Sequence, residues 1–133
     1  MVEVEVLLSI KPEYAEKIFS GEKKYEFRRI SFNLSVNKVV VYASKPVQKI
    51  VGEFEVERII TQNIDDLWES TGHQSCVDKE FYCKYFSGKK LGHAIKVKNP
   101  KSYDKYRNLQ DYDVKCPPQS FIYLTNKKTK NAN

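Results

Sequence analysis

Gly21-Glu22-Lys23-Lys24-Tyr25-Glu26-Phe27-Arg28 is the stretch from which the fold of this chain can be predicted outward. Gly21 follows an amphipathic segment, and a glycine in that place usually ends a helix. The residues after it alternate, so Tyr25 and Phe27 point to one side of a strand, and the acid and base that follow them point to the other. The stretch therefore predicts a helix, a tight turn and a strand with one buried aromatic face.

The charged side chains of this turn and strand form a candidate ligand site. Lys23 lies in the turn, and Glu26 and Arg28 share the solvent face of the strand. The two cations can hold a phosphate or a nucleobase oxygen, while the carboxylate accepts from an exocyclic amine or orients the lysine. An edge strand with a charged outer face and no ligand fits the same pattern about equally well.

Hydrophobic periodicity along the whole chain predicts six strands and two helical regions. The strands are expected at 2–10 (half buried), 25–28, 38–44, 50–57, 91–97 and 120–124, and the helical regions at 12–20 and, as two helices inserted between strands, at 63–70 and 75–88. Gly52 interrupts a strand as a bend would, which favours a small mixed β-barrel of about six strands with flanking helices, an α+β fold. Residues 99–118 are expected as a long loop. One domain is expected over 1–125, followed by a disordered basic tail at 126–133.

Composition indicates a globular protein of the cytoplasm. The chain has 133 residues, of which 41% are hydrophobic, and no apolar run is long enough to span a bilayer. The first residues have neither the basic start nor the apolar block of a signal peptide. The three cysteines, Cys76, Cys83 and Cys116, are expected to be reduced, because their number is odd and no two have the spacing of a metal motif.

No metal ion or cofactor is expected. Glu53, Glu55 and Glu57 alternate along one strand, and this spacing is more typical of a solvated face than of a metal site. His73 lies in a linker and is expected to be exposed, although a catalytic base is the alternative. His93 falls on the same face as Leu91 and the other apolar residues of its strand, which favours a histidine in or beside the core.

Positive charge is concentrated in residues 84–107. The chain carries a net charge of +6, and this segment holds eight Lys or Arg residues against one acid. Tyr85, Phe86, Tyr103 and Tyr106 lie among them. Basic residues interleaved with aromatic residues suit contacts to phosphates together with base stacking, so the segment favours a nucleic-acid partner. A solvated lysine-rich surface is the alternative.

The central stretch reads G-x-K-x-x-E-x-R, and it resembles the signature of the ASCH domain family, which belongs to the PUA-like superfamily. Residues 8–18 resemble the strand and helix that precede this signature, and Val41-Tyr42-Ala43-Ser44-Lys45-Pro46 with Ile50-Val51-Gly52-Glu53-Phe54 resembles the block that follows it. The resemblance is strongest over residues 4–60. It implies a small mixed β-barrel with flanking helices.

The resemblance also implies a function and a site. ASCH domains are generally regarded as RNA-binding modules of translation or transcription control, so the resemblance implies a cytoplasmic, regulatory RNA-binding domain. Its cleft would lie between the first helix and the barrel. The residues that it implies for binding RNA or a nucleotide-like ligand are Lys23, Glu26 and Arg28, with Gly21 making the turn, and then Lys11, Ser44 and Lys45.

Two other functions remain open. One is a hydrolase acting on RNA or on a modified nucleoside, with acid–base chemistry by Lys23 and Glu26 or by Tyr42 and Ser44. A subgroup of the superfamily resembles amidohydrolases that use a lysine and a threonine in this turn. Here Glu26 stands at the threonine position, and a carboxylate does not replace a hydroxyl nucleophile in that chemistry. The other is a regulatory module that senses a nucleotide-like metabolite.

Overall fold

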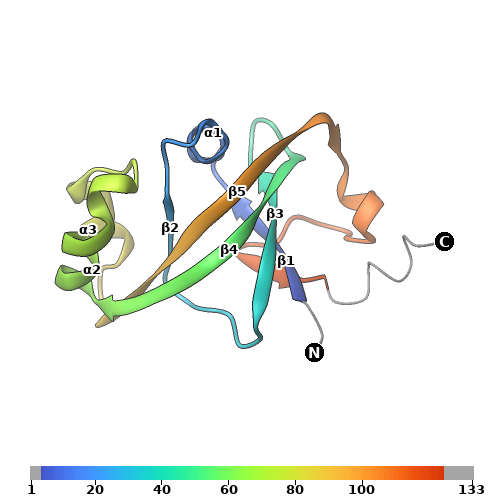
Figure 1. Cartoon of the computed structure of the whole chain (residues 1–133). Coiled ribbons are helices and arrows are strands. Elements are labelled where there is room, and N and C mark those ends of the chain that lie inside the picture. Colours follow the sequence, from blue (N-terminus) through green and yellow to red (C-terminus); the bar gives the residue numbers. More distant parts are fainter. Residues whose placement is uncertain (1–3, 125–133) are drawn as a thin grey trace.

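One mixed sheet of six strands forms the centre of the molecule (Figure 1). The computed structural model describes residues 4–124. The strands are β1 (Val4–Ile10), β2 (Tyr25–Arg28), β3 (Val36–Ala43), β4 (Lys49–Asn63), β5 (Leu91–Arg107) and β6 (Phe121–Tyr123), in the spatial order β2-β5-β4-β3-β1-β6. β1 and β3 run parallel, and every other neighbouring pair is antiparallel. The predicted α+β class and strand number are therefore correct.

The sheet is not closed into a barrel, and here the sequence prediction was wrong. β2 and β6 stand at the two ends of the strand order, and among residues 4–124 no ladder of backbone hydrogen bonds joins them. Side chains bridge the two ends instead, because Arg28 of β2 donates hydrogen bonds to Ser120, just before β6, and to the Ser9 carbonyl oxygen of β1. The place where a barrel would close is thus occupied by polar side chains.

Three α-helices complete the fold of the described residues. α1 (Pro12–Ser20) connects β1 to β2 and has a proline in its first turn, and Gly21 ends it with φ at 89°. α2 (Ile64–Thr71) and α3 (Lys79–Tyr85) lie together at one end of the long β4–β5 ribbon (Figure 1). Asn63 and Asp78 cap them by accepting from backbone N–H groups of the first turn. Short 3-10 turns follow at Gly72–Gln74 and Leu109–Tyr112.

β4 and β5 are longer than predicted. β5 continues through residues 99–107, where we expected a loop, and β4 continues to Asn63. Asn99 has φ at 49°, and Pro100 has no N–H group to donate to a neighbouring strand, so both residues would ordinarily interrupt a strand. Register shifts in the β4–β5 ladder accommodate them, and β5 still pairs with β4 as far as Arg107. Long-range pairing therefore overrides the local signal.

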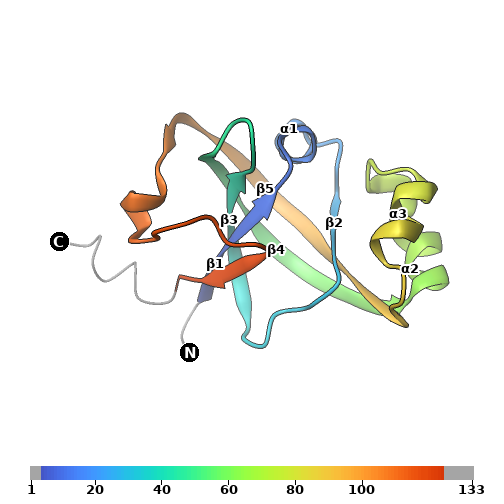
Figure 2. The same ribbon diagram turned by 180° about the vertical axis from the view of Figure 1, so that it is seen from behind.

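Three hydrophobic clusters hold these elements together. The largest lies between α1 and the sheet and includes Ile18, Val41 and Phe54. A second cluster on the opposite face of the sheet includes Leu7, so β1 is buried on both faces and not half buried as predicted. The third cluster is aromatic and attaches α2 and α3 to β2 and β5. Figure 2 shows the two helices on the side of β2 that faces away from β1. Its central residues are Tyr25, Phe27, Leu67, Tyr82 and Phe86.

The predicted tail at 126–133 lies outside the described residues, and the extent of the domain remains a prediction.

Candidate functional site

A cavity of about 390 Å³ lies between β1, α1, β2 and α3, at the place where the sheet is open. Its walls come from elements far apart in the sequence. The lining residues are Ser9, Ile10, Lys11, Tyr14, Lys23, Glu26, Phe27, Arg28, Arg29, Ile30, Ser44, Val77, Phe81, Tyr85, Gln119 and Ser120. Four of these side chains are cationic and one is a carboxylate, so the cavity carries a clear excess of positive charge.

Lys23 is a buried cation at the wall of this cavity, with 1% of its surface exposed. Its Nζ donates to the Ser75 carbonyl oxygen at 2.5 Å and lies 3.7 Å from Glu26 Oε1. The same atom lies 5.1 Å from the centre of the Tyr14 ring and 5.8 Å from that of Phe27. The ammonium is therefore held by one carbonyl, one carboxylate and two aromatic faces.

Glu26 lies between two cations. Its Oε1 faces Lys23, and its Oε2 accepts a hydrogen bond from Arg28 Nη1 at 3.2 Å. Arg28 continues the line by donating to Ser120 and, at 3.5 Å, to the Ser9 carbonyl oxygen. Because β2 alternates, Glu26 and Arg28 point to the cavity while Tyr25 and Phe27 pack in the aromatic cluster, from which Phe27 also reaches the cavity wall.

Burial changes the proton affinities of these groups. Removal from water lowers the pKa of Lys23 below its ordinary 10.5, and the Glu26 carboxylate opposes part of this effect. Burial also raises the pKa of the Tyr14 phenol, with help from Glu13 and Asp78. The cavity thus presents an amine that loses its proton more easily than usual beside a phenol that keeps its proton at neutral pH.

Aromatic rings cover the side of the cavity opposite β1. Phe81 and Tyr85 lie one turn apart on α3, and both are half-buried. Exposed cations lie over both rings, with Lys11 Nζ 5.4 Å from the centre of Phe81 and the Arg29 guanidinium carbon 4.9 Å from the centre of Tyr85. The cavity therefore combines positive charge with accessible aromatic surface.

The structure brings together most of the site residues predicted from the sequence. Those that line the cavity are Lys11, Lys23, Glu26, Arg28 and Ser44. Gly21 does not line it and acts as the αL residue that ends α1. Lys45 also lies outside it and is exposed on the turn after β3. Tyr42 is buried in the second cluster, away from Ser44, so the alternative pair Tyr42 and Ser44 is not assembled in this cavity.

Sequence reasoning missed several residues of the site. They are Ser9, Tyr14, Arg29, Phe81 and Ser120, whereas Tyr85 was named as one of the aromatic residues of the basic segment 84–107. The four-residue spacing of Phe81 and Tyr85 places both on one face of a predicted helix, and such an apolar face is usually interpreted as part of the core. No local signal marked Ser120, which reaches Arg28 only because β6 pairs with β1.

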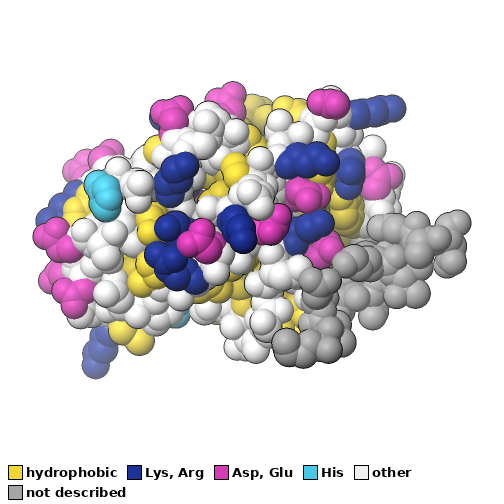
Figure 3. Space-filling model, in the orientation of Figure 1, with side chains coloured by type: hydrophobic (Ala, Val, Ile, Leu, Met, Phe, Trp, Pro, Cys, Tyr) yellow, Lys and Arg dark blue, Asp and Glu magenta, His cyan; other side chains and the backbone are white. Residues whose placement is uncertain are grey.

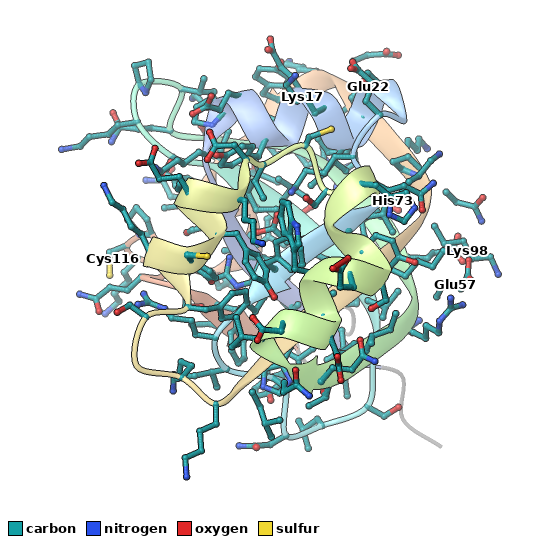
Figure 4. The ribbon with its side chains drawn as sticks, turned by 90° about the vertical axis from the view of Figure 1, so that its left-hand side faces the viewer. Lys17, Glu22, Glu57, His73, Lys98 and Cys116 are labelled. Carbon is teal, nitrogen blue, oxygen red and sulfur yellow. The ribbon has the colours of Figure 1, made fainter. Side chains whose placement is uncertain are left out.

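Neither histidine belongs to the cavity. His73 is exposed in the short turn after α2, and Figure 4 shows it on the outer surface. His93 is half-buried and its Nδ1 lies 2.8 Å from Thr61 Oγ1, at the border of the core as expected. Leu91, assigned with it to an apolar face, is exposed. The three cysteines have no disulfide partner among residues 4–124.

The positive charge of residues 84–107 is offset in part in the folded chain. The neighbouring β4 places a glutamate beside three of the lysines of β5, namely Glu53 opposite Lys101, Glu55 opposite Lys98, and Glu57 at 3.6 Å from Lys96. Figure 3 shows acidic and basic side chains intermixed on this face of the molecule. The long basic track suggested by the sequence is therefore divided by carboxylates, and the excess of cations at the cavity is the clearer anion-binding feature.

Within residues 4–124, no group of three or more His, Cys, Asp or Glu residues lies close enough to hold a metal ion. The same part of the chain has no helix long and apolar enough to cross a membrane.

Comparison with known proteins gives one consistent family. The family model of the ASCH domain matches residues 8–112. The crystal structure of ASCH from Zymomonas mobilis superposes with a TM-score of 0.86 at 26% identity, covering 96% of this chain and 92% of that chain. A protein of Zymomonas mobilis named ASCH domain-containing ribonuclease is 28% identical over 130 residues, which is 95% of this chain and 88% of that protein.

Two longer proteins of Ureaplasma parvum also match this chain. ATP synthase subunit alpha is 30% identical and a large ribosomal subunit protein is 31% identical, each over 120 residues. The matched region covers 90% of this chain in both cases. This chain spans only 15% and 39% of the lengths of those two proteins.

Proposed function

Because the chain belongs to the ASCH domain family, we propose that it binds RNA in the cavity between β1, α1, β2 and α3 and cleaves it there. The proposal is carried by the contacts among Lys23, Glu26 and Arg28. A buried amine and a guanidinium flank one carboxylate at the cavity wall. The ASCH domain-containing ribonuclease of Zymomonas mobilis, similar over nearly the whole chain, supports cleavage.

Binding rests on the excess of cations at the cavity. Arg28 presents a planar fork that suits a phosphate, and Ser9 and Ser120 hold it in place. Lys11 and Arg29 are exposed at the cavity and can meet neighbouring phosphates of a strand. Such contacts release counterions from the nucleic acid, so binding should weaken steeply as salt rises.

The proposed cleavage uses Lys23 and Tyr14, which line the same cavity with the Lys23 Nζ atom 5.1 Å from the centre of the Tyr14 ring. The 2′-oxygen of a ribose attacks the adjacent phosphorus, the bond from phosphorus to the 5′-oxygen breaks, and a 2′,3′-cyclic phosphate forms. Lys23, with its lowered pKa, takes the proton of the 2′-hydroxyl. Tyr14, with its raised pKa, keeps its proton and gives it to the leaving 5′-oxygen. Arg28 balances the charge that develops on the phosphoryl oxygens, and Glu26 positions the Lys23 amine and the Arg28 guanidinium.

A binding module without catalysis, the regulatory function expected first from the sequence, is the second candidate. One observation favours it, since both carboxylate oxygens of Glu26 face cations. This carboxylate is therefore poorly placed to act as a free base, and catalysis depends on Lys23 alone as the proton acceptor.

The test is incubation of labelled single-stranded RNA with the purified protein, followed by native and denaturing gels at several salt concentrations. The variants are Lys23→Met and Arg28→Lys, and the matched control is Lys17→Met on the exposed side of α1 (Figure 4). We expect fragments ending in 2′,3′-cyclic phosphate, formed at least about tenfold more slowly by both cavity variants and at an unchanged rate by the control. An all-deoxy copy of the RNA should stay intact.

Each other result has a definite meaning. Salt-sensitive binding of intact RNA by the wild type, lost in Arg28→Lys, would replace cleavage by the binding module. Equal cleavage by the wild type and both folded cavity variants would assign the activity to a contaminant. Neither binding nor cleavage by the wild type would refute the proposal and direct the search to small nucleosides.

A further inference from the structure

α3 divides its aromatic residues between two sides. Tyr82 and Phe86 point inward, are 1% and 2% exposed, and attach the helix to the sheet through the aromatic cluster. Phe81 and Tyr85 are half-buried and line the cavity. Tyr85 packs partly against the cluster, whereas Phe81 belongs to none of the three hydrophobic clusters formed by the described residues. Core packing therefore explains the rings of Tyr82 and Phe86, and it does not explain the ring of Phe81.

The two outer rings are parallel and stack with an offset, so each ring has one face turned away from the other. Their planes differ by 9° and their centres lie 6.1 Å apart. The Tyr14 ring stands against Phe81 at 5.8 Å and 57°, so it borders this pair of rings and does not cover it as a parallel ring would. We use the term aromatic platform for Phe81 and Tyr85 together.

Positively charged side chains surround the platform. Lys11 and Arg29 lie over its two rings, and both side chains are exposed. A cation on an exposed ring is held more weakly than a base stacked on the same ring. An incoming base can therefore displace both cations, which then lie beside the phosphates that flank the base.

We infer that the aromatic platform binds one unpaired nucleobase of the RNA by stacking. This inference rests on the proposed function and adds the part of the substrate that the cavity holds besides phosphate. Every base has a π face, so the platform accepts all four bases. A base within a duplex has its faces covered by its neighbours, so paired strands are excluded unless the base leaves the stack.

The test separates the base from the backbone. The probe is a short chain of tetrahydrofuran phosphodiesters that carries a single central 2-aminopurine, and the reference is the same chain with no base. Neither chain has a 2′-hydroxyl next to a phosphate, so neither is cleaved, and binding is measured without catalysis. Fluorescence of 2-aminopurine falls when the base is stacked, which reports its environment directly.

The variants are Phe81→Leu and Tyr85→Leu, which keep apolar volume but remove the flat ring. Phe81→Trp restores an aromatic face, and Tyr85→Phe removes only the hydroxyl that donates to the Phe27 carbonyl oxygen at 3.2 Å. The matched control is Tyr106→Leu, because Tyr106 is an exposed aromatic residue outside this cavity. Phe81→Leu decides the question if Tyr85→Leu fails to fold.

We expect the wild type to bind the chain with one base about tenfold more tightly than the chain with none, with quenched fluorescence. Phe81→Leu should bring this ratio close to one while salt-sensitive binding of both chains persists. Phe81→Trp, Tyr85→Phe and Tyr106→Leu should keep the ratio of the wild type.

Two results would overturn the aromatic platform and leave the proposed function standing. They are a ratio near one in the wild type, and a wild-type ratio in both leucine variants, in each case while RNA is still bound or cleaved. If the wild type binds neither chain and neither binds nor cleaves RNA, the platform and the proposed function fall together.

Discussion

Replacing Lys23 by methionine should destabilise the fold, because this ammonium connects β2 to the insertion that contains α2 and α3. The change keeps the length of the side chain and removes its charge. It leaves the buried Ser75 carbonyl without its 2.5 Å hydrogen bond from Lys23 Nζ, and an unsatisfied buried acceptor costs roughly 1–3 kcal/mol. Breaking a buried ion pair costs roughly 3–5 kcal/mol when the remaining charge is left alone.

Here the remaining charge is not alone. Glu26 keeps Arg28 at 3.2 Å, and its distance to Lys23 is already 3.7 Å, so the ion-pair loss should lie well below that range. Methionine also avoids the cost of burying a cation, which offsets part of the loss. The net expectation is a free energy of unfolding lower by about 2 kcal/mol, or a urea midpoint lower by about 1 M.

Urea unfolding followed by far-UV circular dichroism at pH 7 measures this change. Lys17→Met is the control, because it makes the same replacement on an exposed face of α1 and should change stability by less than about 0.5 kcal/mol. If Lys23→Met is as stable as Lys17→Met, the ammonium does not hold the insertion in place, and the described network is wrong.

The same pair of proteins should show a pH dependence of known sign. Burial lowers the pKa of Lys23 below 10.5, so the unfolded chain holds this proton more tightly than the folded chain. Stability therefore rises with pH as the folded amine loses its proton. The difference in unfolding free energy between the wild type and Lys23→Met should grow from pH 8 to pH 10, and a constant or shrinking difference would contradict the assigned direction.

Two further changes test the packing around the sheet. Gly52→Ala should cost about 1–3 kcal/mol in urea unfolding, because a Cβ atom there would lie 2.5 Å from Phe19 and 2.6 Å from the backbone oxygen of Lys101, and an unchanged midpoint would contradict this close approach. Tyr82→Phe should cost about 1 kcal/mol at pH 7, because the hydroxyl donates to the Ile64 carbonyl oxygen. Burial raises the pKa of Tyr82 to about 12, so its stabilising effect is present below pH 10 and is lost as pH rises through 12. The variant should lose less stability than the wild type between pH 10 and pH 12, and equal losses would argue against a buried phenol.

Much of the site was predictable because its central part is local. The two-residue period of a strand sends Glu26 and Arg28 to one side, and both line the cavity, while Tyr25 and Phe27 pack in the aromatic cluster. The predicted solvent face is wrong for Glu26, which is buried, and Phe27 also reaches the cavity wall. Family membership, inferred from the signature around Gly21, is confirmed by the match over residues 8–112.

The sequence also predicted most of the helices and strands, because each of them has its own hydrophobic periodicity and its own residues that mark its ends. The limits of prediction appear where one strand depends on another. Pro100 and Asn99 indicate a loop, and only pairing with β4 keeps residues 99–107 in a strand.

The electrostatics of the site were decided by tertiary structure. The sequence shows Lys23 as a lysine in a turn, which would ordinarily be exposed. It is buried because Ser75, from the insertion after β4, covers it, and this contact spans 52 residues of chain. The contact between Arg28 and Ser120 spans 92 residues, and it depends on β6 pairing with β1.

By itself, the sequence determined which residues close in the chain lie on the same side of a helix or strand, since backbone geometry alone sets those neighbours. Only the tertiary structure decided which charged side chains are buried, which lie beside an opposite charge and which are exposed. Glutamates of β4 lie beside lysines of β5, whereas four cationic side chains and a single carboxylate line the cavity. A charge's solvation and partners depend on segments distant in sequence, and therefore the positively charged cavity forms only when the chain is folded.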